Sequence, residues 1–296
     1  MILPGRLSPG EMYPAGEANV SARFVRVPSG ITVRAVESGS SDAPAIVLVP
    51  GWACTAWIYH QTLPALAAAG FRAIAVELKG HGLSDKPTRP GEYSLASMTD
   101  HLLSILDALD LPVAGLVGHS MGASIAVHAA QRSPDRVSGL ALVAPVGFAG
   151  VRGMGLFRAL TPEMLVPFLA GVPTRFVVRT MLSFVYGDLR GPDTRDVDEL
   201  RAPSQFPEYT RALRNLLHEF DWAAEFPQLA MPHIVIAGTK DHLSPAREAH
   251  RYARGESLVV VEGAGHVLFS EAPEVINETL VRFFRSPQGG DYISIQ

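Results

Sequence analysis

A serine at position 120 stands between two glycines, Gly118 and Gly122, in the stretch GLVGHSMGASIAVHAA (115–130). The apolar residues before the serine favour a strand, and the small residues after it favour a helix. A serine at such a sharp strand-to-helix turn projects clear of the sheet on strained backbone, and glycines on either side let strand and helix approach closely. We therefore predict that Ser120 is a nucleophile on an elbow formed with Gly118 and Gly122.

A serine hydroxyl is a weak nucleophile at neutral pH and needs a neighbouring base. His266 and Asp241 each follow an apolar run that predicts a strand, 257–263 for the histidine and 233–238 for the aspartate. The order Ser, Asp, His along the chain is one known arrangement of a serine nucleophile, its orienting acid and its base. We expect Asp241 to orient and charge-stabilise His266, which takes the proton of Ser120.

Simpler roles for the acid and the base stay open at this point. His266 taken alone could be an ordinary hydrogen-bonded histidine, and Asp241 could stabilise the start of a following helix. Asp221 and Asp193 are possible replacements for Asp241, although neither follows a predicted core strand.

Four other reactive side chains are assigned structural roles. His119 is expected to pack beneath the elbow, and His81 and His242 to be surface or hydrogen-bonded loop residues. Cys54 is expected to be a small buried residue rather than a nucleophile.

The elements that must position these residues alternate between strands and helices. Such alternation predicts an α/β fold with a mostly parallel sheet and helices on both faces. The predicted strands are two within 21–38, then 45–51, 71–78, 113–119, 137–145, 233–238 and 257–263, and the predicted helices are 55–70, 94–111, 120–133, 245–254 and 272–286.

The alternation breaks between the two halves of this pattern, where Met-, Phe- and Leu-rich segments predict helices and no buried strand is evident. We interpret the break as a helical insertion into one α/β core. The predicted organisation is an irregular N-terminal arm (1–20), a core (21–145 and 223–286), a helical insertion (146–222) and a C-terminal tail (287–296).

The composition excludes several classes of function. The chain of 296 residues is 47% hydrophobic and carries a formal net charge of −4, which argues against disorder and against binding to nucleic acid. One cysteine and scattered histidines predict neither a disulfide nor a metal site. No apolar run reaches the ~20 residues of a membrane span, and no signal peptide is evident, so a cytoplasmic protein is expected. The oligomeric state is left open.

The sequence resembles the α/β-hydrolase superfamily over residues 22–145 and 223–286. The resemblance is carried by GHSMG, GTKDHLSP, GAGHVLFSEAP and ELKGHGLSDKP (77–87). It implies an α/β-hydrolase fold, with the insertion as a helical cap over the site, and it favours the serine esterase and lipase-like branch. A serine nucleophile argues against the haloalkane dehalogenase and epoxide hydrolase branches, which attack with a carboxylate.

Two positions depart from the family pattern. Glu77 replaces the usual aspartate, which we take as structural and of little consequence, and Pro50 stands where histidine is common. The resemblance implies that the backbone N–H groups of Trp52 and Met121 form an oxyanion hole. Pro50 lacks an N–H but leaves that of Trp52 in place.

These features predict a cofactor-free serine hydrolase that cleaves small apolar carboxylic esters. Aryl or short- and medium-chain acyl esters are expected substrates, and monoacylglycerols fit the apolar insertion. The same triad also serves C–C bond hydrolases, lactonases, amidases and acyltransferases, so these activities stay open. Less favoured alternatives are a small-molecule receptor and a non-catalytic interaction protein.

Overall fold

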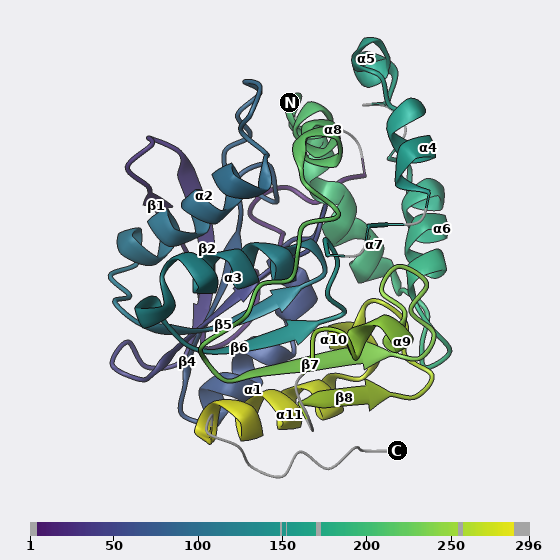
Figure 1. The fold of residues 1–296 in the computed structure, drawn as a ribbon. Helices are drawn as coiled ribbons and strands as arrows, with labels where there is room; N and C mark the ends of the chain where they lie inside the picture. The colour runs from purple at the N-terminus through teal and green to yellow at the C-terminus, as the bar shows by residue number, and fades with distance from the viewer. Residues whose placement is uncertain (1–4, 149, 152, 170–172, 254–256, 287–296) are drawn as a thin grey trace.

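The computed structural model describes residues 5–148, 150–151, 153–169, 173–253 and 257–286. An eight-stranded sheet forms its centre, with strand order β1-β2-β4-β3-β5-β6-β7-β8 (Figure 1). β2 pairs antiparallel with β1 and with β4, and every other neighbouring pair is parallel. The mostly parallel sheet predicted from the sequence is thus confirmed. The strands are β1 (Val20–Arg26), β2 (Thr32–Ser38), β3 (Ala45–Val49), β4 (Arg72–Glu77), β5 (Ala114–His119), β6 (Val137–Val143), β7 (His233–Gly238) and β8 (Leu258–Val261).

Helices cover both faces of the sheet, as predicted. On one face α2 (Leu95–Ala108) and α3 (Met121–Arg132) pack together, and on the other α1 (Thr62–Ala68) packs against α11 (Pro273–Arg285). The shorter elements of the core are η1 (Ala56–Tyr59), η2 (Pro134–Arg136), α9 (Ala246–Ala249) and α10 (Leu268–Glu271).

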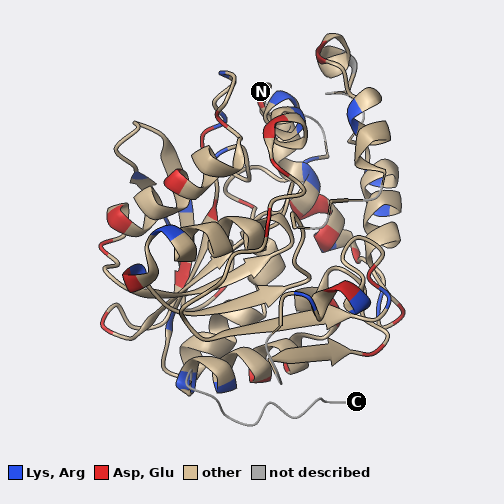
Figure 2. Cartoon of the chain, in the orientation of Figure 1, with Lys and Arg blue, Asp and Glu red and all other residues tan. Residues whose placement is uncertain are grey.

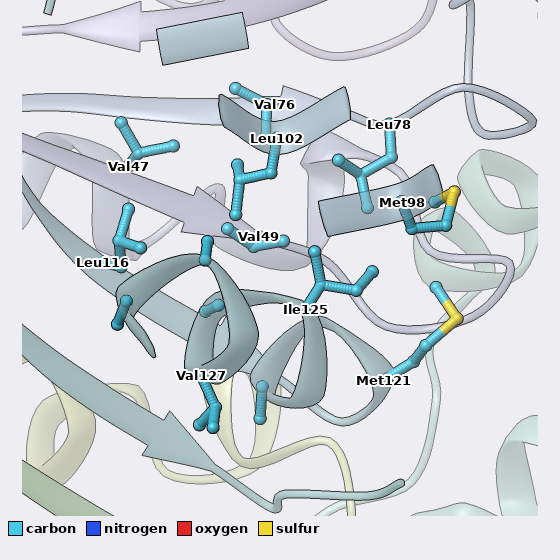
Figure 3. Packing of buried hydrophobic residues seen from close by; sticks show 14 of the residues in the cluster. Val47, Val49, Val76, Leu78, Met98, Leu102, Leu116, Met121, Ile125 and Val127 are labelled. Atoms are coloured by element: carbon cyan, nitrogen blue, oxygen red, sulfur yellow. The ribbon is translucent and has the colours of Figure 1, made fainter. Parts of the chain in front are cut away.

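The central strands are apolar along their whole length because both of their faces are covered. Along β3, Val47 and Val49 point into one hydrophobic cluster, and Ile46 and Leu48 point into the other. Figure 3 shows the first cluster, in which strand residues such as Leu116 meet side chains of α2 and α3. Period-two alternation thus sends neighbouring side chains of one strand into opposite clusters.

Five helices lie between β6 and β7 and are called the inserted helices here. Gly147 forms a parallel bridge with Ala223, and the Ala224 amide donates to the Gly147 carbonyl at 2.9 Å, so the segments that enter and leave the insertion lie side by side. The inserted helices are α4 (Met154–Ala159), α5 (Val166–Leu169), α6 (Arg175–Val185), α7 (Thr194–Arg201) and α8 (Tyr209–Glu219), with η3 (Glu163–Leu165) and η4 (Ala202–Gln205) between them.

One expectation on the elements needs correction. The predicted helix 245–254 is helical only in α9, because a short helix depends on tertiary packing and only Ala249 and Tyr252 are buried there. Within the insertion, the polar segment around α7 forms a helix because Asp193 caps it and exchanges hydrogen bonds with Asp196 in a capping box.

The two ends of the chain lie partly outside the described residues, namely 1–4 and the predicted tail 287–296. Residues 5–19 form turns and bends without a helix or strand. Met12 and Tyr13 of this segment are nevertheless fully buried. The Tyr13 amide donates to Glu199 of α7 at 2.7 Å, so the N-terminal segment joins the inserted helices.

Candidate active site

Ser120 lies at the sharp turn between β5 and α3. Its φ of 53° lies in the left-handed region that non-glycine residues rarely adopt. A Cβ on Gly118 would approach Ala123 Cα to 2.5 Å, and one on Gly122 would approach the Val49 carbonyl oxygen to 2.2 Å. The two glycines therefore permit the close contact between α3 and the strands that holds Ser120 in this strained position.

Ser120, His266 and Asp241 meet at the carboxyl edge of the sheet. Ser120 Oγ lies 2.8 Å from His266 Nε2, and His266 Nδ1 lies 2.7 Å from Asp241 Oδ2. The three residues are 8%, 6% and 4% exposed, in that order, so water competes little for these bonds. This is the geometry in which an imidazole accepts the serine proton while a carboxylate fixes its tautomer.

The Asp241 carboxylate also accepts hydrogen bonds from the loop that follows it. Its Oδ1 accepts the amides of Leu243 and Ser244 at 2.8 and 2.9 Å, while Oδ2 faces His266. These amides belong to the loop before α9, which begins at Ala246 and has no side-chain cap, so the expected role at the start of that helix is not observed. The suggested replacements lie elsewhere: Asp221 accepts the amide of Ala223, and Asp193 caps α7.

The loop after β3 lies against the serine. A Cβ on Gly51 would stand 2.9 Å from Ser120 Cβ and 3.4 Å from its Oγ, which places the next amide, that of Trp52, in the same region. Met121 is the first residue of α3, where a helix leaves backbone N–H groups without intrahelical partners. The two amides suggested for an oxyanion hole thus flank Ser120.

Sequence reasoning missed how the inserted helices hold this loop. The Trp52 indole N–H donates to the Leu213 carbonyl of α8 at 3.1 Å, and the Tyr209 hydroxyl donates to the Ala53 carbonyl at 3.4 Å. The acceptors are backbone carbonyls, which any residue supplies, so no sequence motif could have indicated these contacts.

The remaining histidines and the cysteine occupy structural positions. His119 is buried beneath the elbow, where Nε2 lies 2.9 Å from the His266 carbonyl, and burial lowers its pKa to about 3. His242 is exposed, whereas His81 is buried beside the Lys79 carbonyl, so the surface alternative for His81 is wrong. Burial raises the pKa of Cys54 to about 12, which leaves a poorly nucleophilic thiol.

Glu77 has several hydrogen-bond partners in and around the loops beside the site. It is fully buried at the end of β4, and its carboxylate accepts Arg34 Nη1 at 3.1 Å and the amides of Ala56 and Leu83 at 3.1 and 2.7 Å. Removal of such a carboxylate leaves buried donors unpaired. These contacts agree with the structural role expected for residue 77.

A polar hollow lies outside the group formed by Ser120, Asp241 and His266. It has a volume of about 810 Å³ and lies between the β1–β2 turn, the loop after β4 and the start of α2. Its lining is polar and includes Lys79, Asp85 and His101, and it does not include Ser120. His101 Nε2 accepts the Lys79 amide at 3.0 Å, so this imidazole supports the loop.

Neither a metal-ligand cluster nor a membrane-spanning helix is present in the parts of the chain that the structure describes. Within those ranges, His, Cys, Asp and Glu side chains form no group of three or more that could hold a metal ion. Among the helices that can be described, none combines the length and the apolar character needed to cross a bilayer.

Comparison with known proteins places this geometry in a family. The sequence pattern of the alpha/beta hydrolase fold matches residues 44–273. The dihydrolipoyllysine-residue acetyltransferase component of the acetoin cleaving system of Pseudomonas putida is 32% identical to the chain, with 86% of this chain and 67% of that protein aligned.

Two solved structures show the same fold. Epoxide hydrolase A of Mycobacterium thermoresistibile is 25% identical, with a TM-score of 0.70 over 90% of this chain and 98% of that one. The meta-cleavage product hydrolase of Pseudomonas fluorescens IP01 is 22% identical, with a TM-score of 0.71 over 90% and 98% of the two chains. The sheet, the strand-to-helix turn at Ser120 and the match over most of the sequence lead to one conclusion: the chain belongs to the α/β-hydrolase fold family.

Proposed function

We propose that the protein is a serine hydrolase that cleaves carboxylic esters through an acyl-enzyme on Ser120. The observation that carries this proposal is the continuous hydrogen-bonded chain from Ser120 Oγ through His266 to Asp241, with distances of 2.8 and 2.7 Å. Such a chain activates a hydroxyl near neutral pH without a metal or cofactor.

The proposed reaction has two halves. His266 takes the proton of Ser120 as Oγ attacks the ester carbonyl, and the amides of Trp52 and Met121 receive the negative charge that develops on the carbonyl oxygen. His266 then gives the proton to the leaving alcohol, and an acyl–serine ester remains. Water that loses a proton to His266 cleaves this ester, which releases the acid and restores Ser120. Asp241 stabilises the imidazolium in both halves.

The nucleophile separates this proposal from epoxide hydrolysis, the activity named for one of the similar structures. A carboxylate that opens an epoxide forms an ester, which water can cleave. Ser120 Oγ would form an ether instead. Water does not cleave an ether near neutral pH, so the enzyme would be inactivated after one reaction. An acyl group on Ser120 has no such difficulty, and this favours carbonyl substrates.

The inserted helices favour an apolar substrate. Among the residues that the structure describes, eleven large hydrophobic side chains are exposed, and nine of them lie between residues 156 and 189. One of them, Phe184, lies with its ring 5.9 Å from that of His242, the neighbour of Asp241 in the chain. Apolar side chains at the rim suit aryl or short- to medium-chain acyl groups better than charged ones. We accordingly propose that these helices form a cap over the site.

A substrate panel tests the proposal. p-Nitrophenyl esters of increasing acyl length should be hydrolysed, styrene oxide should not be, and Ser120→Ala should lower kcat by ~10³-fold or more. Faster loss of a coloured ring-cleavage dienoate than release of p-nitrophenol would instead assign C–C bond hydrolysis. Transfer of the acyl group to an added alcohol in preference to water would assign acyl transfer. Wild-type turnover by Ser120→Ala would contradict the mechanism.

A further inference from the structure

The carboxylate of Glu271, in α10, binds three backbone amides at once. Its Oε2 accepts Gly187 N–H at 2.6 Å and Gly265 N–H at 2.9 Å, and its Oε1 accepts Val267 N–H at 3.1 Å. Glu271 is 7% exposed, its bonds to Gly265 and Val267 are buried, and its bond to Gly187 is partly buried. Three charge-assisted bonds to one buried carboxylate form a strong clamp.

Two of the three amides flank His266. Gly265 and Val267 are its neighbours in the chain, and the peptide groups of His266 itself are also bonded to protein. The His266 amide donates to the Val185 carbonyl at 2.7 Å, and the His266 carbonyl lies 2.9 Å from His119 Nε2. The backbone around the imidazole is therefore fixed by protein groups on every side, and Glu271 supplies two of the contacts.

The third amide, that of Gly187, belongs to the inserted segment just beyond the end of α6. This segment touches the histidine loop backbone to backbone: a Cβ on Gly265 would lie 2.4 Å from Gly187 N, and one on Gly187 would lie 2.4 Å from Gly265 N. The Asp188 amide also donates to the Gly263 carbonyl at 2.7 Å. Both positions must be glycine for the two backbones to approach this closely. The approach lets the amides of Gly187 and Gly265 reach the same carboxylate oxygen.

Loss of the carboxylate would leave these amides without acceptors. Burial raises the pKa of Glu271, and the amide bonds oppose that rise by favouring the ionised form. Buried N–H groups without partners are costly, so the two segments would move apart or admit water. Either response displaces the backbone that carries the His266 ring.

We propose that Glu271 is a positioning residue for His266, and that it acts by clamping the inserted segment at Gly187 to both sides of the histidine. This inference rests on the proposed role of His266 as the base for Ser120. If so, the segment around Gly187 helps to hold the His266 imidazole in place, in addition to connecting α6 to α7.

The test is Glu271→Gln, with Glu278→Gln as the matched control on an exposed acid of α11. Glutamine has the same shape but replaces one acceptor oxygen by a donor, so at least one amide loses its partner. We expect kcat for a p-nitrophenyl ester to fall about 10- to 100-fold, with KM changed by less than about 3-fold. Glu278→Gln should match the wild type. Wild-type kcat in a folded Glu271→Gln protein would overturn the proposal.

Two readouts distinguish a local effect on His266 from a wrong choice of ester substrate and from general destabilisation of the fold. The rate at which a fluorophosphonate labels Ser120 needs no substrate, and it should fall in parallel with kcat. Amide hydrogen exchange should rise at residues 185–188 and 263–267 while the central strands keep their protection. A uniform rise in exchange, or unchanged labelling, would contradict a local clamp. Should Glu271→Gln fail to fold, fast exchange of the Gly187, Gly265 and Val267 amides in the wild type would refute the proposal.

Discussion

The edge of the sheet that carries Ser120 is built in the opposite way to two of the inserted helices, α4 and α6. At the edge, Ser120, Asp241 and His266 are all under 9% exposed and hydrogen-bonded to one another. In the insertion, α4 has no buried residue and α6 has only Val178. Close packing thus fixes the edge, whereas α4 and α6 leave much apolar surface in contact with solvent.

Polar contacts join α4 and α6 to α7, α8 and the segment that follows α8. Arg158 donates to the Leu217 and Phe220 carbonyls, and the Arg175 guanidinium forms two hydrogen bonds of 2.7 Å with the Asp198 carboxylate of α7. Figure 2 shows blue residues on α4 and α6 among tan ones, with red residues mainly on α7 and α8. We therefore expect substitutions at the packed edge to disturb the fold more than substitutions on the exposed faces of α4 and α6.

The contrast is sharpest for apolar side chains. Leu116 on β5 is fully buried, whereas Phe176 on α6 is 80% exposed. Leu116→Ala should lower the free energy of unfolding by about 2–5 kcal/mol, because it leaves a cavity in the core. Phe176→Ala should change it by less than about 0.5 kcal/mol. Denaturant titration of both variants measures the two changes in the free energy of unfolding. Similar changes would mean that α6 packs as tightly as the sheet.

Glycines give the second test. A Cβ on Gly122 would clash with the backbone of Val49 and Pro50, whereas a Cβ on Gly155 of α4 meets nothing within 4 Å. Gly122→Ala should destabilise the fold by about 1–3 kcal/mol or more, since the backbone must move. Gly155→Ala should stabilise it by about 0.5–1 kcal/mol, because alanine favours the helix. Thermal unfolding measures both, and a loss at Gly155 would break the comparison.

The smallest expected effect is a pH dependence in the insertion. Burial raises the pKa of Glu199 to about 7, against the opposing effect of the Tyr13 amide and Arg195. The folded state therefore keeps this proton after the unfolded chain has released it, so the contribution to stability is complete below pH ~4.5 and is lost as the pH rises through about 7.

Glu199→Gln keeps the shape and has no proton to lose. Its stability relative to the wild type should rise by on the order of 1 kcal/mol between pH 5 and pH 8. Unfolding curves at the two pH values provide the measurement. A constant difference between the proteins would show that Glu199 titrates normally.

Much of the core could be predicted from the sequence because its signals are local. Continuous apolar runs such as 45–49 and 233–238 are typical of strands covered on both faces, and their alternation with helices fixes the sheet. Ser120, Asp241 and His266 could be found for a related reason. Each follows a predicted strand, and parallel strands place such positions at one edge.

The rest depends on contacts that leave little trace in the sequence. The carboxylate of Glu271 binds amides at Gly187, Gly265 and Val267, and any residue type can offer an amide. The close approach of two backbones at Gly187 and Gly265 was not visible in either segment alone. The helix α7 did have a local signal, the Asp193–Asp196 capping box, but proline and polar residues around it obscured the pattern.

The central claim is that Ser120 becomes covalently acylated. Mixing the enzyme with p-nitrophenyl acetate, quenching it in acid within milliseconds and mapping the peptides by mass spectrometry tests this claim directly. We predict one acetyl group on Ser120, formed as fast as the burst of p-nitrophenol and absent from Ser120→Ala. A burst with the acetyl group on another residue, or steady release of p-nitrophenol with Ser120 never modified, would contradict the account.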